Sequence, residues 1–192
     1  MKGIHIFLAD GFEDMEAICT IDVLRRGSLD VKTVSISGST QVTSSHGITV
    51  KADMTYEELT AGMASAEADP EDVMIFPGGM PGTRNLAAHA GLINLMREHF
   101  AQGGIVAAIC AAPGLVVSQL PGLKGRKFTC FDGFEDYLLA QGAEYICQRA
   151  VSDGNLITGR GAGCAVDFGL EILRKLKGDD VLANVRHGLM LD

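Results

Sequence analysis

One cysteine lies where a buried strand is expected to turn abruptly into a helix. The run 105–109 is short, apolar and rich in β-branched residues, which is typical of a strand buried on both faces. Pro113 and Gly114 follow it, and proline suits a first helical turn. Cys110 is therefore expected at a nucleophile elbow, where a sharp strand-to-helix turn exposes one side chain at the carboxyl edge of a sheet. A thiol at a helix N-terminus is favoured as the thiolate.

Other positions that could do chemistry come shortly after other expected strands. Glu16 follows the first strand, Gly78-Gly79 offers exposed backbone N–H groups after another, and Phe131 follows a third. In a parallel sheet these positions meet at one rim with Cys110, where α/β folds bind their ligands. Two structural alternatives remain open: an inert core cysteine, and a solvated Glu16 favoured only by the helix dipole.

Alternating strands and helices are expected to position these residues. The pattern predicts an α/β fold with a mostly parallel sheet and helices on both faces. The pattern predicts a hairpin-like segment over residues 41–52 and a second hairpin turn at Asp153-Gly154. Residues 64–72 are expected to form a connecting segment on the surface. The expected strands cover residues 3–8, 31–37, 73–76, 105–109, 127–130, 144–152 and 156–158, and the expected helices cover 13–26, 55–61, 92–101, 134–141, 164–177 and 181–191.

Composition excludes several classes of protein. A chain of 192 residues, 47% of them hydrophobic, is expected to form one domain over 1–192 that buries about 70% of its unfolded surface. The net charge of −8 argues against nucleic acid or an anionic membrane as partner. The longest nearly apolar run, 105–117, is too short to span a bilayer. The first residues read as a strand and not as a signal peptide.

The cysteines predict a reducing compartment. Their number, five, is odd, and no Cys-x-x-Cys pair occurs among them. This pattern favours reduced thiols in the cytoplasm over a disulfide framework or a zinc site. The glycines at 159–163 do not fit a dinucleotide-binding motif, because Val166 stands where the third glycine would be. No cofactor and no metal are expected.

Four short motifs in one order carry a resemblance to a known family. They cover residues 10–16, 77–79, 107–113 and 160–163. Together they resemble the ThiJ/PfpI superfamily, specifically the branch of the parkinsonism-associated protein deglycase. The similarity runs over essentially the whole chain. It implies a flavodoxin-like sandwich, related to class I glutamine amidotransferases, that forms a homodimer.

The resemblance also implies roles for individual residues. In that family the elbow cysteine is a low-pKa thiolate and the glutamate of the first helix is a protonated donor to it, which correspond to Cys110 and Glu16. The family's oxyanion donors correspond to the backbone N–H groups of Gly79 and Ala111. The residues expected to line the pocket are Gly78, Phe131, His46, Cys130 and Arg160.

One departure from the family bears on the chemistry. Some members carry a histidine where this chain has Phe131, and phenylalanine neither takes nor gives a proton. Only His187 follows Cys110 in the sequence, and Gly188 and Leu189 come after it. A cysteine peptidase triad and an amidotransferase His-x-Glu motif are therefore disfavoured. His46 is a candidate for the pocket, with a solvated loop histidine as the alternative.

The favoured function is a cysteine-dependent enzyme that acts on α-oxoaldehydes. Such an enzyme would hydrate methylglyoxal or glyoxal to a hydroxy acid, or remove their adducts from proteins. Cys110 would form a hemithioacetal, and Glu16 would move a proton between adjacent carbons. The alternative is a redox sensor of oxidative stress or a holdase chaperone that uses a Cys110 sulfinate.

Overall fold

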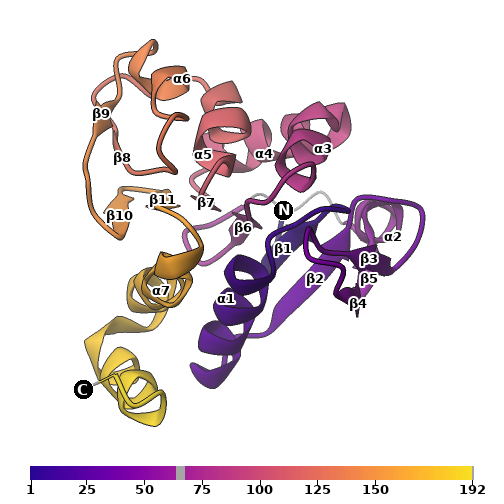
Figure 1. The fold of residues 1–192 in the computed structure, drawn as a ribbon, viewed down its shortest axis with the longest axis horizontal. Helices are drawn as coiled ribbons and strands as arrows, with labels where there is room; N and C mark the ends of the chain where they lie inside the picture. Colours follow the sequence, from indigo (N-terminus) through magenta and orange to yellow (C-terminus); the bar gives the residue numbers. More distant parts are fainter. Residues whose placement is uncertain (64–67, 192) are drawn as a thin grey trace.

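A seven-stranded sheet forms the centre of the molecule (Figure 1). The computed structural model describes residues 1–63 and 68–191. The strands are β1 (Ile4–Leu8), β2 (Val31–Ser35), β5 (Met54–Thr55), β6 (Val73–Phe76), β7 (Ile105–Ile109), β10 (Ala150–Asp153) and β11 (Leu156–Gly159). Their order is β10-β11-β7-β6-β1-β2-β5, and only β10 runs antiparallel to its neighbour. The predicted mostly parallel α/β fold is confirmed.

Helices cover both faces of this sheet. Along β1, the side chains of Ile6 and Phe7 point to opposite faces and join two separate buried clusters. One face packs against α1 (Asp14–Arg26) and α7 (Ala165–Gly188), which lie side by side in Figure 1. The other face packs against α2 (Tyr56–Gly62), α3 (Gly82–Ala88), α4 (Ala90–Ala101) and α5 (Ala112–Leu115). A sheet covered on both faces needs continuous apolar strands, which explains runs such as β7.

Helix α1 begins where the sequence predicts. Glu13 caps it by accepting the backbone N–H of Glu16 at 2.7 Å, and Arg25 and Arg26 lie in its last turn. These charges suit the helix dipole. The helix buries Glu16 completely but leaves Met15 and Ile18 about half exposed.

Both predicted hairpins are present. Strand β3 (Gln41–Thr43) pairs antiparallel with β4 (Thr49–Lys51). The second hairpin joins β10 to β11 through Gly154, whose φ of 60° suits the turn. The first hairpin is tied to the β1–α1 turn, because the Gly11 N–H bonds the Thr43 carbonyl at 2.8 Å.

The prediction that Phe131 follows a strand of the main sheet is wrong. Strand β8 (Lys127–Phe128) pairs only with β9 (Glu144–Tyr145), in a separate two-stranded sheet. Beyond β8, the Thr129 N–H donates to the side-chain hydroxyl of Thr158 in β11 and not to a backbone carbonyl, so this segment does not pair with β11 as a strand. The predicted strand 144–152 is likewise split into β9 and β10, because the Gln148 N–H turns back to the Ile146 carbonyl.

The observed helices follow the predicted ones in part. Gly178, at φ 77°, interrupts α7 as predicted, and the chain resumes as a helix that ends at Gly188. Helix α3 was not predicted, because Pro81 and Gly82 read as turn residues. The predicted helix 134–141 is the shorter α6 (Asp136–Leu139). The predicted connecting segment 64–72 lies partly outside the described residues.

Among the described residues, no helix has both the length and the apolar character needed to cross a membrane.

Candidate active site

Cys110 lies at the predicted elbow, directly after β7. Its backbone is left-handed, with φ 65°, a conformation that a non-glycine residue adopts at a cost of about 1–3 kcal/mol. The Cys110 N–H bonds the Gly159 carbonyl at 3.0 Å, and this bond continues the pairing of β7 with β11. The thiol is partly exposed, whereas the side chains of Ala111 and Ala112 after it are buried. The turn therefore presents one side chain at the rim, as in a nucleophile elbow.

Glu16 lies in the first turn of α1, directly after β1, and its carboxyl reaches the same rim. Its side chain is fully buried, and its Oε2 accepts the Gly78 N–H at 2.7 Å. Its Oε1 is buried without a regular hydrogen bond to any described residue, while the carboxyl interacts with the Cys110 thiol. A Cβ on Gly78 would lie 2.6 Å from Glu16 Oε2 and 2.9 Å from Cys110 Sγ. Only glycine at 78 allows the carboxyl and the thiol to come this close.

Two backbone donors complete the site. The N–H groups of Gly79 and Ala111 bond the Cys110 sulfur and act to lower the pKa of its thiol. Gly79 has φ 89°, and a Cβ there would lie 2.4 Å from the Glu13 nitrogen, so the turn requires glycine. The site thus draws on the carboxyl ends of the adjacent strands β1, β6 and β7, as predicted.

The thiol and the carboxyl titrate as a pair. Burial, partly offset by the Gly78 N–H, raises the pKa of Glu16 to about 7. Burial and then the negative charge of Glu16 raise the pKa of the Cys110 thiol to about 12. While Glu16 is ionised, the pKa of the Cys110 thiol thus lies above that of a free cysteine. When the proton moves to Glu16, the charge disappears and a neutral carboxyl can donate to the sulfur, which favours the thiolate. Between the two pKa values the pair holds one proton, on either group.

This coupling predicts the pH dependence of alkylation by iodoacetamide. The pair loses its first proton as the pH rises through about 7, so the alkylation rate of Cys110 should rise with a midpoint near 7. Cys130, which is buried and whose pKa is raised to about 12, should react only after unfolding. Peptide mass spectrometry after timed labelling measures both rates. A Cys110 midpoint near about 8.5, the value of a free thiol, would contradict the shared proton.

The other predicted site residues lie around the Cys110–Glu16 pair or away from it. Phe131 lies next to the elbow, because its N–H bonds the Cys110 carbonyl at 2.9 Å, and Cys130 beside it is buried. His46 is exposed and pairs with Asp14 through Nδ1, which raises the pKa of the imidazole. No contact between His46 and Cys110 is found among the described residues, so a place for His46 in the pocket stays a prediction.

Within the described part of the chain, one group of side chains could hold a metal ion. Ligand atoms of Glu13, Asp14 and His46 lie within 4.8 Å of one another. All three already have partners, since Glu13 caps α1 and Asp14 pairs with His46. Sequence reasoning missed the capping role of Glu13, which orients the first turn that carries Glu16. An acid three residues before another acid at a helix start is the signal that could have indicated it.

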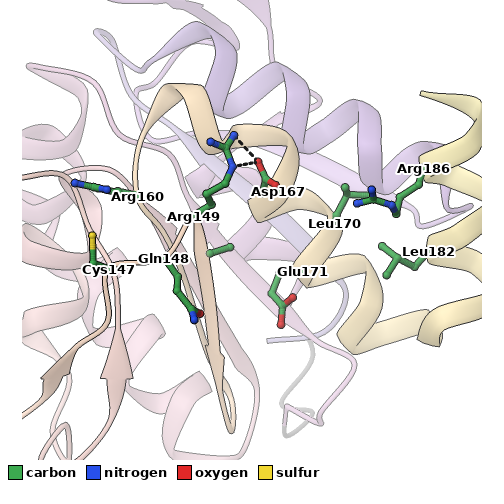
Figure 2. Close-up of a pocket in the computed structure, with 10 residues that line it drawn as sticks. Cys147, Gln148, Arg149, Arg160, Asp167, Leu170, Glu171, Leu182 and Arg186 are labelled. Carbon is green, nitrogen blue, oxygen red and sulfur yellow. Dashed lines mark hydrogen bonds and ion pairs between the residues drawn. The ribbon is translucent and has the colours of Figure 1, made fainter. Parts of the chain in front are cut away.

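Arg160 lines a separate hollow of about 510 Å³ between the 147–150 segment and α7 (Figure 2). The Cys147 sulfur points toward the Arg160 side chain in this view, and Arg149 and Arg186 line the same hollow. The guanidinium of Arg160 pairs with Asp132 at 2.9 Å, outside the Cys110 turn. Its predicted place in the Cys110 pocket therefore remains a prediction.

Comparisons with known proteins agree with this geometry. The chain matches the DJ-1/PfpI family over residues 2–175. It is 32% identical to protein dj-1beta of Drosophila melanogaster, over 99% of this chain and 97% of the relative. It is 31% identical to the protein named deglycase PfpI of Pyrococcus furiosus, over 88% of this chain and 96% of the relative. It also matches Arabidopsis thaliana DJ-1 homolog A at 32% identity, but it spans only 47% of that longer protein, about half of its length.

Solved structures show the same architecture. The crystal structure of a DJ-1 superfamily protein from Salmonella typhimurium has a TM-score of 0.86 and 34% identity, covering 99% of this chain and 98% of that one. Drosophila melanogaster DJ-1beta also has a TM-score of 0.86, with 30% identity over 98% and 97% of the two chains. The fold is thus the flavodoxin-like arrangement of these proteins.

Proposed function

Because this chain belongs to the DJ-1/PfpI family, we propose that it is a cysteine-dependent enzyme that acts on α-oxoaldehydes. Its reaction would be the hydration of methylglyoxal or glyoxal to a 2-hydroxy acid, or the removal of their adducts from proteins. One observation carries the proposal: the Glu16 carboxyl, the Cys110 thiol and two backbone N–H donors converge around Gly78. A named deglycase among the relatives supports the same class of reaction.

In the first step the Cys110 thiolate attacks the aldehyde carbon. A C–S bond forms, and the carbonyl π electrons move to the oxygen, which becomes an alkoxide. The N–H groups of Gly79 and Ala111, which first hold the sulfur, then lie close enough to stabilise the new charge. A proton from Glu16 neutralises the alkoxide and completes the hemithioacetal.

In the second step Glu16 moves a proton between the two carbons. The carboxylate removes the proton from the carbon bonded to sulfur, and the electron pair passes to the ketone oxygen, which gives an enediolate. That oxygen takes the proton of the adjacent hydroxyl, and Glu16 returns its proton to the neighbouring carbon, which leaves a 2-hydroxy thioester. Water then cleaves the C–S bond and releases the hydroxy acid and the thiol. A pKa of about 7 suits a group that must both accept and donate near neutral pH. Phe131 cannot exchange a proton, so Glu16 would make both transfers.

Steady-state turnover tests this proposal most directly. Protein purified without exposure to peroxide should convert methylglyoxal to lactate, one molecule for each aldehyde consumed, as followed by NMR. Absence of lactate from protein whose thiol is intact by mass would overturn the proposed function.

The proposal extends to the assembly and its location. Met15 and Ile18 on α1 and Ile48 on the β3–β4 hairpin are exposed apolar side chains, at 52%, 46% and 55% of their surface. Such side chains suit a subunit contact, so we propose a homodimer through this side of the molecule. The five free cysteines support a cytoplasmic location, and the net charge of −8 supports a small-molecule substrate over nucleic acid.

A redox role is the second candidate function, and the buried Glu16 favours it. Oxidation of the Cys110 thiolate by peroxide would give a sulfinate, whose oxygens accept hydrogen bonds. A protonated Glu16 carboxyl beside the sulfur can donate one of them, and the N–H groups of Gly79 and Ala111 can donate others.

Mild peroxide treatment should therefore add two oxygens to Cys110. The reason is that hydrogen bonds from Glu16 and from the N–H groups of Gly79 and Ala111 stabilise the sulfinate, which favours it over a disulfide. Peptide mass spectrometry should show the added mass of two oxygens on the Cys110 peptide alone. Recovery of a Cys110–Cys130 disulfide instead would make Cys130 a resolving thiol and would contradict the sulfinate.

A further inference from the structure

Three aromatic side chains form a row beside the elbow, which we call the aromatic shelf: Phe131, Phe134 and Tyr137. The ring centroids of Phe131 and Phe134 lie 6.5 Å apart at 66°, and those of Phe134 and Tyr137 lie 6.3 Å apart at 19°. Phe131 is 50% exposed and Tyr137 is 49% exposed. Adjacent aromatic side chains that are exposed to water suit a binding surface, because contiguous apolar patches mark interaction sites and aromatic rings contribute strongly to binding.

The shelf begins at the nucleophile. The Phe131 N–H bonds the carbonyl of Cys110 itself, at 2.9 Å. The Phe131 ring covers Gly161, since a Cβ there would lie 3.3 Å from Phe131 Cδ2. Gly161 follows β11, the strand that pairs with β7, so the ring lies over the end of the strand next to Cys110. The shelf is therefore continuous with the rim that carries the thiol.

The shelf is also held in place before any ligand binds. Phe134 packs so closely on the elbow helix that a Cβ on Gly114 would lie 2.8 Å from Phe134 Cβ. The Phe134 N–H bonds the Phe131 carbonyl at 3.1 Å. A surface that is already ordered loses little conformational entropy when a ligand binds, so its contacts contribute to affinity.

We propose that the aromatic shelf binds an aryl group attached to the α-oxoaldehyde, so that arylglyoxals are better substrates than methylglyoxal. The inference rests on the proposed function, because the substrate reaches the shelf from Cys110. In the hemithioacetal, the carbon that carries the side group is two bonds from the sulfur. A phenyl group there lies beside Phe131, where it stacks and leaves water. Stacking of this kind corresponds to about a tenfold gain in kcat/KM.

The test compares phenylglyoxal with methylglyoxal as substrates of the same protein. In wild type, kcat/KM should be about tenfold or more higher for phenylglyoxal, with formation of mandelate measured by chromatography. Cys110→Ala serves as the blank for reaction of phenylglyoxal with arginine side chains. In Phe131→Ala this preference ratio should fall about tenfold, mainly through a higher KM for phenylglyoxal.

Matched variants separate the shelf from general effects. Leu139→Ala removes another exposed apolar side chain, from α6, and should leave the preference ratio unchanged. Phe131→Leu keeps an apolar contact over Gly161 but offers no ring, so it should also lose the preference, and it replaces Phe131→Ala if that variant does not fold.

The outcomes distinguish this inference from the proposed function. Turnover of methylglyoxal without a preference for phenylglyoxal would overturn the aromatic shelf as a substrate site and leave the enzyme reaction standing. An equal loss for both aldehydes in Phe131→Ala would do the same, because it would make Phe131 a structural residue. No turnover of either aldehyde by wild type would overturn the proposed function, and the substrate assigned to the shelf with it.

Discussion

Replacement of Cys110 by alanine is expected to reduce methylglyoxal turnover by about a thousandfold or more, because the proposed reaction passes through a C–S bond. No neighbouring thiol can take over this role at the elbow: Cys130, the nearest cysteine in sequence, is buried. Lactate formation by Cys110→Ala and wild type at equal concentration measures the effect.

Two control variants keep this result interpretable. Cys147→Ser removes an exposed thiol and should leave turnover unchanged. Cys110→Gly should be as inactive as Cys110→Ala but at least as stable to heat, because glycine adopts a φ of 65° without the strain that alanine retains. Residual turnover in both Cys110 variants above a few per cent of wild type would show that the thiol is not the nucleophile.

The parts of this fold that follow local rules could be predicted from the sequence. The apolar run of β7 bounded by glycine and proline indicates a buried strand and a turn, and the structure has both. The acids and arginines at the ends of α1 indicate its boundaries to within one residue. Each of these signals lies within a few residues of the element it describes, and local propensity and periodicity decide such elements.

What could not be predicted depends on partners distant in sequence. The path of the chain after β8 is decided by the bond from the Thr129 N–H to the Thr158 hydroxyl, which no local pattern indicates. The same holds for the acidity of Cys110. A helix N-terminus alone favours a thiolate, but the pKa depends on a carboxyl 94 residues earlier in the chain, on its burial, and on which of the two groups holds the proton.

Replacement of Glu16 by glutamine is the substitution with the second largest expected effect: it should lower aldehyde turnover by about a hundredfold or more. The amide can accept the Gly78 N–H through its oxygen and donate an N–H to the sulfur, so the packing of the fully buried side chain is kept. It cannot accept a proton from the carbon of the hemithioacetal. The chemical step is therefore lost while the geometry remains, and kcat should fall with little change in KM.

The pH dependence separates this proton transfer from the hydrogen bond. In wild type the pair loses its first proton near pH 7, so turnover and alkylation should both rise through that pH. In Glu16→Gln no carboxyl shares the proton, and the buried thiol titrates alone, so the alkylation midpoint should move above 7. In Glu16→Ala the donor to the sulfur is absent as well, and the midpoint should lie higher again. Wild-type turnover in Glu16→Gln would show that Glu16 transfers no proton, and the redox role of Cys110 would then be the better account of the site.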